Sequence, residues 1–193
     1  MALLDTFKQF NWLDIFVIIL LLRIGYIAIK TGLPLELFKL LGTIVSVYLS
    51  LHYYSAWADF LKARPALKNI PLELLSFVSF IALVILGHAI FILLRSLFLR
   101  FLKLEAVANL NKWGGLLLGI ARGILLASLI MFILVISNLG YPKNSVKNSY
   151  SGKYLLRVAP ATYSTIWNNL ASKFMTGEKF NEAIIEVQKE LIP

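Results

Sequence analysis

Residues 112–139 form one apolar run, KWGGLLLGIARGILLASLIMFILVISNL, which is long enough to cross a membrane as a single helix. Gly115, Gly119 and Gly123 recur in this run at every fourth residue. At about 100° per residue these glycines lie on one face of a helix, where they allow a second helix to approach closely. The run therefore predicts a membrane helix that is packed tightly in a bundle.

Arg122 lies inside the same run, next to Gly123. An arginine near the middle of a membrane span costs at least about 2.5–3.5 kcal/mol on insertion scales, so it requires a partner or a watery cavity. One interpretation is a buried ion pair or carbonyl-bound arginine that fixes helix register, and the other is a residue that lines a solute path. The acidic residues within reach, all near predicted span ends, are Asp14, Glu36 and Glu73.

The rest of the chain repeats this apolar character. Of its 193 residues 59% are hydrophobic and only 15% are charged, with a mean hydropathy of +0.79, which argues against a soluble fold. Four stretches have membrane-spanning length, at 12–29, 33–54, 72–94 and 113–139. We expect an all-α polytopic membrane protein with a four-span bundle over residues 1–139. The first stretch is expected to remain as an anchor, since no Ala-x-Ala cleavage pattern follows it.

Residues 140–193 form a polar segment in which two stretches have amphipathic helical spacing. Residues 154–170 place Tyr163, Ile166, Trp167 and Leu170 on one face. A second apolar stripe contains Phe180, Ala183, Ile184, Val187 and Leu191. Four acids recur at four-residue spacing in this last stretch, at Glu178, Glu182, Glu186 and Glu190. They indicate either a solvated acidic face or a helix that docks on another protein.

The polar residues offer no catalytic set. The chain has no cysteine and only His52 and His88, so neither a metal site nor a disulfide is expected. It also has no phosphate-binding loop and no dinucleotide fingerprint, so we expect no enzymatic activity and no cofactor. His88, in the third stretch, is open to two interpretations: a proton relay or pH switch, and a hydrogen-bonded core residue.

The formal net charge of +9 raises the question of a nucleic-acid partner. The basic residues are scattered around the apolar spans and do not form one basic face interleaved with aromatic residues. We therefore expect the partner to be the lipid bilayer, with its anionic headgroups, and not nucleic acid.

Several of these residues resemble a known pattern. Asp14 opens the first span after Asn11-Trp12-Leu13, Gly32 and Glu36 have the spacing G-x-x-x-E, and residues 115–123 read G-x-x-x-G-x-x-R-G. In these motifs, and more loosely in Ser151 and Pro160, the chain resembles the colicin V production protein family. One departure is Asn111, where the family usually has an aspartate. The resemblance does not cover the chain beyond about Trp167.

The resemblance implies a multi-pass protein of the bacterial inner membrane that supports colicin V production or export and, more broadly, the envelope. Two hypotheses follow. The first is a non-enzymatic scaffold or assembly factor, in which the glycine face joins a second copy or a membrane-protein partner. The second is an oligomeric channel or small-solute transporter, in which Arg122 and His88 line the path.

Overall fold

The computed structural model describes residues 11–101 and 108–191, and in this part of the chain it contains helices and no strands. Four long helices each carry a segment apolar enough to cross a membrane. This confirms the expected all-α polytopic membrane protein. The four helices are α2 (Trp12–Thr31), α3 (Leu33–Lys62), α4 (Leu72–Phe101) and α5 (Ala108–Ile136).

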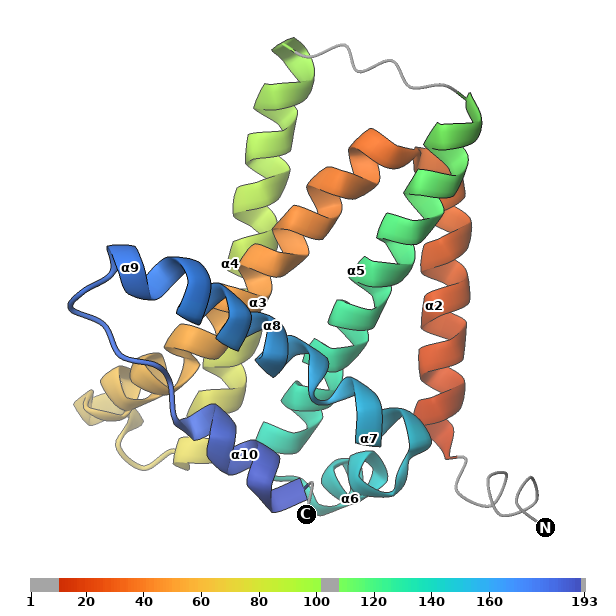
Figure 1. Ribbon diagram of the computed structural model, residues 1–193. Helices are drawn as coiled ribbons and strands as arrows, with labels where there is room; N and C mark the ends of the chain where they lie inside the picture. Colours follow the sequence, from red (N-terminus) through yellow and green to blue (C-terminus); the bar gives the residue numbers. More distant parts are fainter. Residues whose placement is uncertain (1–10, 102–107, 192–193) are drawn as a thin grey trace.

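Helix α3 crosses the bundle obliquely and lies at its centre (Figure 1). It packs against α4 and α5, whereas α2 packs mainly against α5. The residues that follow α5 return to the end of the bundle at which α2 begins (Figure 1). Residues from both termini of the described chain therefore meet at one end, and the α2–α3 turn lies at the other.

The helix starts follow from local polar chemistry. At the start of α2, Asn11 and Asp14 form a capping box: the Asn11 side chain accepts from the Leu13 N–H at 2.8 Å, and Asp14 accepts from the Asn11 N–H at 2.9 Å. Gly32 (φ 79°) makes the sharp turn into α3, in a backbone conformation that favours glycine. The first N–H of α3, from Leu33, donates to the Asn111 side chain of α5 at 2.7 Å.

Several helix ends differ from the predicted spans. Helix α3 continues beyond Tyr54 to Lys62, and this extra length exposes Trp57 and Phe60 at the end of the bundle. Helix α5 ends at Ile136, before the predicted limit of 139, because Asn138 takes a left-handed conformation with φ of 52°. The third span continues to 101, and residues 102–107 lie outside the described part of the chain.

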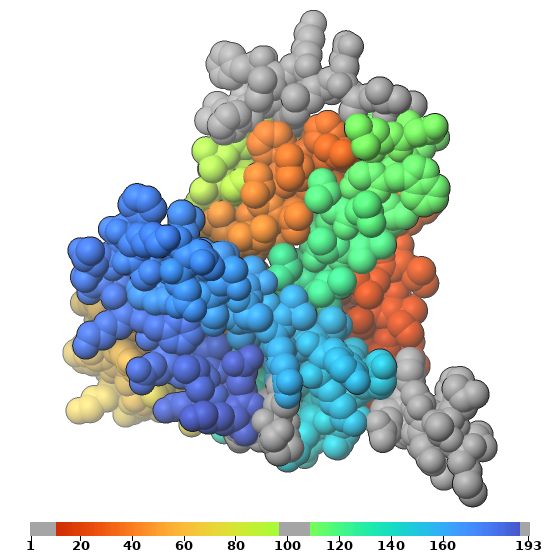
Figure 2. Space-filling model, in the orientation of Figure 1, coloured from red at the N-terminus to blue at the C-terminus, as the bar shows by residue number. Residues whose placement is uncertain are grey.

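The C-terminal segment contains more helices than the two amphipathic stretches predicted. The polar residues 141–153 form most of the first two helices. In order the elements are α6 (Gly140–Asn148), α7 (Tyr150–Leu155), α8 (Val158–Ile166), a π-helical turn (Trp167–Ala171), α9 (Ser172–Phe174) and α10 (Ala183–Leu191). Together they cover one face of the bundle at the end where the segment begins (Figure 2). We call residues 140–191 the C-terminal platform.

The π-helical turn corrects the predicted apolar face of residues 154–170. Tyr163 and Trp167 are buried as expected, but Leu170 is exposed and Ala171 is buried in its place. A π turn holds one more residue than an α turn, so it moves the inward-facing position along by one. The prediction from periodicity supposed a regular α-helix, and it therefore placed Leu170 on the buried face where the structure has Ala171.

The platform shares the core of the bundle. Phe80 of α4 and Phe132 of α5 stack with their ring centroids 5.4 Å apart, and Tyr54 of α3 meets both rings edge-on. The same buried cluster includes platform side chains, namely Val146, Leu156, Tyr163 and Ile184. The C-terminal platform is therefore packed as part of the bundle.

Candidate functional site

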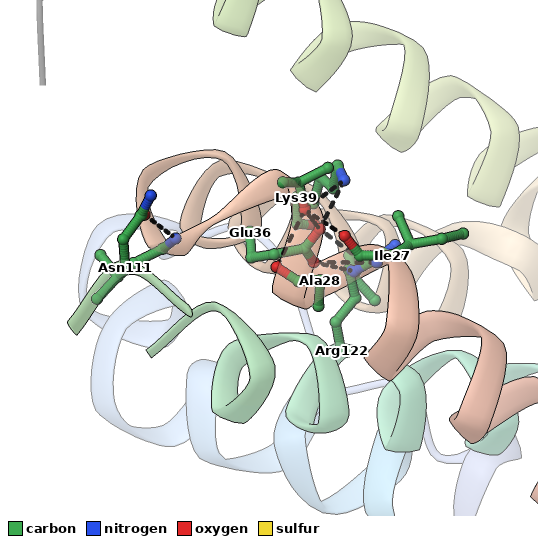
Figure 3. Close-up of polar contacts among 9 residues, drawn as sticks. Ile27, Ala28, Glu36, Lys39, Asn111 and Arg122 are labelled. Carbon is green, nitrogen blue, oxygen red and sulfur yellow. Dashed lines mark hydrogen bonds and ion pairs between the residues drawn. The ribbon is translucent and has the colours of Figure 1, made fainter. Parts of the chain in front are cut away.

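The most buried charge in the described chain is Glu36, whose side chain is 0% exposed one turn into α3. One carboxylate oxygen accepts from the Thr31 hydroxyl and from the Lys39 ammonium, each at 2.6 Å. The other accepts a hydrogen bond from Arg122 Nε at 3.1 Å and lies 3.0 Å from Arg122 Nη2 in an ion pair. Figure 3 shows Lys39 and Arg122 converging on this carboxylate. Both carboxylate oxygens are therefore fully engaged.

This arrangement gives Arg122 the partner that its position in the membrane demands. Among the three acids within reach, it is Glu36 that the fold brings to it. The two residues belong to α3 and α5, and two guanidinium nitrogens of Arg122 lie beside the same Glu36 carboxylate oxygen. The ion pair between Glu36 and Arg122 therefore links α3, at the centre of the bundle, to α5, which carries the three glycines.

The three glycines of α5 face α2 of the same chain. A side chain at Gly119 would collide with the Cβ atom of Ala28, and a Cβ at Gly115 would lie 2.7 Å from the Ala28 carbonyl oxygen. A Cβ at Gly123 would lie 2.8 Å from Leu21. Helix α2 occupies this face, so the hypothesis that it joins a second copy does not agree with where the structure places it.

The glycine face and the ion pair are parts of one arrangement. The position of a Cβ at Gly119 lies 3.7 Å from the Glu36 carboxylate as well as against Ala28. Because the glycines of α5 have no side chain there, α2 packs close to α5. The turn at Gly32, which follows α2, then places Glu36 beside α5. The motif residues Gly32, Glu36 and Arg122 thus lie together at one end of the bundle.

His88 lies on α4 and faces α3. Its Nδ1 atom is 2.8 Å from the oxygen of the Ser46 hydroxyl, which donates its proton to the Gly42 carbonyl oxygen at 2.9 Å. Gly87 permits this approach, because a Cβ there would lie 2.7 Å from Ser46. His88 and Arg122 both line one cavity of about 230 Å³ between α3, α4 and α5.

Asp14 lies at the opposite end of the bundle and is 3% exposed. Besides capping α2, its carboxylate accepts from the N–H and the hydroxyl of Ser151, at 2.7 and 2.6 Å, and from the Tyr150 N–H at 3.3 Å. Nearby, Asn11 and Trp12 donate to Ser145. Asp14 therefore joins the start of the first span to the platform, 137 residues further along the chain.

Replacing Asp14 with asparagine tests this junction. An amide has one acceptor oxygen where the carboxylate has two, and its bonds lack charge assistance, so we expect the junction to weaken by about 1–2 kcal/mol. Hydrogen exchange of the Tyr150 and Ser151 amides reports the loss directly. The exposed Asp59→Asn is the matched control and is expected to leave these amides protected. Equal protection in both variants would contradict the role given to Asp14.

A third polar cluster, which sequence reasoning missed, fixes the far end of the platform to α3. His52 Nδ1 is 2.8 Å from the Tyr163 hydroxyl, and His52 Nε2 is 2.5 Å from Glu178. Tyr53 donates to the same carboxylate at 2.9 Å, and the Asn181 N–H donates to Tyr163 at 3.1 Å. No local sequence pattern predicts this cluster, since His52 and Glu178 are 126 residues apart.

Burial raises the pKa of the Tyr163 hydroxyl, which therefore keeps its proton at neutral pH. That hydroxyl accepts from Asn181 and has one proton to donate, which His52 Nδ1 can accept. In the tautomer whose Nδ1 accepts this proton, Nε2 carries the ring proton and can donate to Glu178. This tautomer satisfies each group in the chain from Asn181 to Glu178.

Tyr163→Phe removes the hydroxyl at the centre of this cluster. His52 Nδ1 and the Asn181 N–H then lose their partner in a buried place, so we expect unfolding to become easier by about 1–2 kcal/mol. Thermal unfolding in detergent measures the change. Tyr154→Phe deletes the same atom from an exposed ring and should have no effect. A Tyr163→Phe protein as stable as the Tyr154→Phe control would show that the hydroxyl is dispensable.

Of the four acids predicted as a row, Glu178 and Glu182 precede α10 and so do not share a helical face with Glu186, and the side chain of Glu190 lies outside the described part of the chain. Glu178 precedes α10 and binds His52 and Tyr53, whereas Glu182 and Glu186 are exposed. The apolar side of α10 packs on the bundle through Ile184, which is buried. Among the described residues, no three potential metal-binding side chains are grouped together.

Four apolar helices, a buried ion pair between α3 and α5, and a C-terminal segment that shares their core define a polytopic α-helical membrane protein. The model of the colicin V production protein family matches residues 13–160. The chain belongs to the colicin V production protein family. Neither a curated protein nor a solved structure matches it.

The matched region contains both of the first two polar centres. It includes Asp14 with Ser151, and Glu36 with Arg122, and it ends within α8. Tyr163, Glu178 and α10 lie outside it. The cluster around His52 is therefore assembled from two residues inside the match, His52 and Tyr53, and three beyond it, Tyr163, Glu178 and Asn181.

Proposed function

We propose that the protein is a non-enzymatic scaffold or assembly factor of the bacterial inner membrane, which supports toxin production or export and maintenance of the envelope. Membership of the colicin V production protein family supports the connection to toxin production. The observation that carries the proposal is the C-terminal platform, which is fixed to the membrane helices and carries exposed apolar side chains.

Three polar junctions fix the platform to the bundle. Asp14 binds the start of α7, the Ser128 hydroxyl of α5 accepts from the Ala159 N–H of α8 at 2.7 Å, and His52 of α3 binds Glu178. Each junction uses a buried or half-buried side chain from a different long helix. Because the three junctions lie on three different helices, they hold the platform in one orientation relative to the membrane. A docking surface requires a fixed orientation of this kind.

The exposed apolar side chains of the platform form the proposed docking surface. Four large apolar side chains of the described platform are more than half exposed, and they are Tyr141, Tyr154, Leu170 and Phe174. Phe174, at 79%, is the most exposed of them. Exposed aromatic side chains on a rigid support are typical of protein interfaces. We propose a membrane-protein partner of the export machinery as the occupant, with a second copy of this chain as the alternative.

A toxin-secretion assay tests this function. The protein is expressed in a colicin V-producing strain that lacks its own member of the family, and secreted toxin is measured by growth inhibition of a sensitive strain. We expect native protein to restore secretion and Leu170→Ser/Phe174→Ser to lose it while remaining folded in the membrane. Lys173→Ser, which changes the same segment without removing apolar surface, is the control. Full secretion with the double variant would refute the proposed surface.

The second candidate function, an oligomeric channel or small-solute transporter, is favoured by one observation. The cavity between α3, α4 and α5 is lined by Arg122 and His88. Flux of ions and small solutes into proteoliposomes is the test, comparing native protein with Glu36→Gln/Arg122→Leu, which removes both charges together. Flux that depends on this pair would support a conduction path, and its absence from folded native protein would reject one.

A further inference from the structure

The cavity beside Arg122 lies between membrane-spanning helices and is lined by several positively charged side chains. Lys39 of α3, Arg95 of α4 and Arg122 of α5 all line it, in addition to His88. Its remaining walls are largely apolar and include Phe91 and Ile92. Three helices thus each direct one basic side chain to the same volume of about 230 Å³.

One carboxylate cannot balance these cations. Glu36 is shared between Lys39 and Arg122, and both of its oxygens are already engaged. Arg95 makes no ion pair with any side chain that the structure describes. Three positive charges against one negative charge leave a surplus of two. A surplus of this kind in an apolar environment favours an anionic ligand.

We propose that this cavity binds the phosphate of an anionic phospholipid headgroup. The volume is smaller than the 300–1,000 Å³ of typical small-molecule pockets, so it fits a headgroup and not a whole lipid. Ile92 lines the cavity and is 62% exposed, and Leu93 beside it is exposed as well. Acyl chains can therefore follow this apolar side of α4 while the phosphate reaches Arg95 and Lys39.

The location of the basic residues agrees with a headgroup as ligand. Arg95 directly follows the apolar stretch 72–94 of the sequence, and Lys39 follows the start of α3 by less than two turns. Lys39 retains an exposed fraction of 23%, so its ammonium group remains accessible beside Glu36. These positions place both cations near one end of the bundle, where the headgroups of a bilayer lie.

The test uses the full chain in mild detergent, with lipid binding followed by native mass spectrometry. Short-chain phosphatidylglycerol is the anionic probe, and phosphatidylcholine of equal chain length is the zwitterionic one. We expect Arg95→Gln to weaken phosphatidylglycerol binding about tenfold, which corresponds to the loss of one charge-assisted contact. Lys112→Gln removes the same charge from an exposed site at the same end of the bundle and should bind as native protein does.

A second variant keeps every charge and narrows the cavity instead. We expect Ile92→Trp to reduce phosphatidylglycerol binding, whereas Leu93→Trp at the neighbouring exposed position should not. Three results would each overturn the proposal: native-like binding by both Arg95→Gln and Ile92→Trp, equal binding of the two lipids by native protein, or displacement of the lipid by millimolar inorganic phosphate. The last result would identify a free anion as the ligand.

Discussion

Glu36→Gln is expected to destabilise the folded protein by about 3–5 kcal/mol, the cost of removing one partner from a buried ion pair. The carboxylate is completely buried, and among the described acids it is the one that forms ion pairs with Arg122 and Lys39. Without its charge, the guanidinium of Arg122 remains in an apolar bundle with no counter-ion. Unfolding in detergent mixtures of increasing sodium dodecyl sulfate measures the free energy lost.

Two further variants identify the cause of that loss. Glu36→Gln/Arg122→Met removes both charges of the pair, and we expect it to be more stable than Glu36→Gln alone, because no unpaired guanidinium is left. Glu73→Gln changes an exposed acid at the start of α4 and should be neutral. If the double variant were no more stable than Glu36→Gln, packing around the side chain, and not its charge, would explain the effect.

The helices were predictable because length and apolar composition alone identify a membrane span. The same is true of the need for a partner at Arg122, which follows from the cost of a lone charge in lipid. Which acid would supply it was not predictable, since Glu36 and Arg122 are 86 residues apart in sequence. That pairing depends on how closely α2 approaches α5 and on the turn at Gly32.

The platform was the least predictable part of the chain. Its junctions with the bundle join Asp14 to Ser151 and His52 to Glu178, pairs that no local spacing connects. The π-helical turn after α8 also breaks the periodicity on which the amphipathic prediction rested. Sequence reasoning thus located the helical stripes, while the exact inward residue and the polar anchors depend on tertiary contacts.

Asn111 shows how a departure from a family pattern can be explained by geometry. Its side-chain oxygen accepts the first N–H of α3, at Leu33, which has no side-chain cap of its own from Gly32. An aspartate could accept that N–H through the same kind of oxygen. The structural contact at this place therefore needs an acceptor and does not need a negative charge.

The second large effect is expected at the glycine face. Gly119→Leu should destabilise the protein by about 3 kcal/mol, at the upper end of the cost of overpacking, because even a Cβ at this position collides with Ala28 of α2. Helix α2 must then move away from α5, and Glu36, which follows the turn from α2, is displaced from Arg122. Thermal unfolding measures the loss, and Gly140→Ala, at a glycine with no neighbour within 4 Å, is the control.

An exchange of side chains between the two helices tests the contact itself. Gly119→Ala adds a Cβ that meets the Cβ of Ala28, and Ala28→Gly removes that atom, so the double variant should be more stable than the sum of the two single effects predicts. The same exchange cannot rescue Gly115→Ala, whose Cβ meets the Ala28 carbonyl oxygen at 2.7 Å. Additive effects at Gly119 and Ala28 would show that the two positions are not in contact, and would remove the structural link between the glycine face and the ion pair.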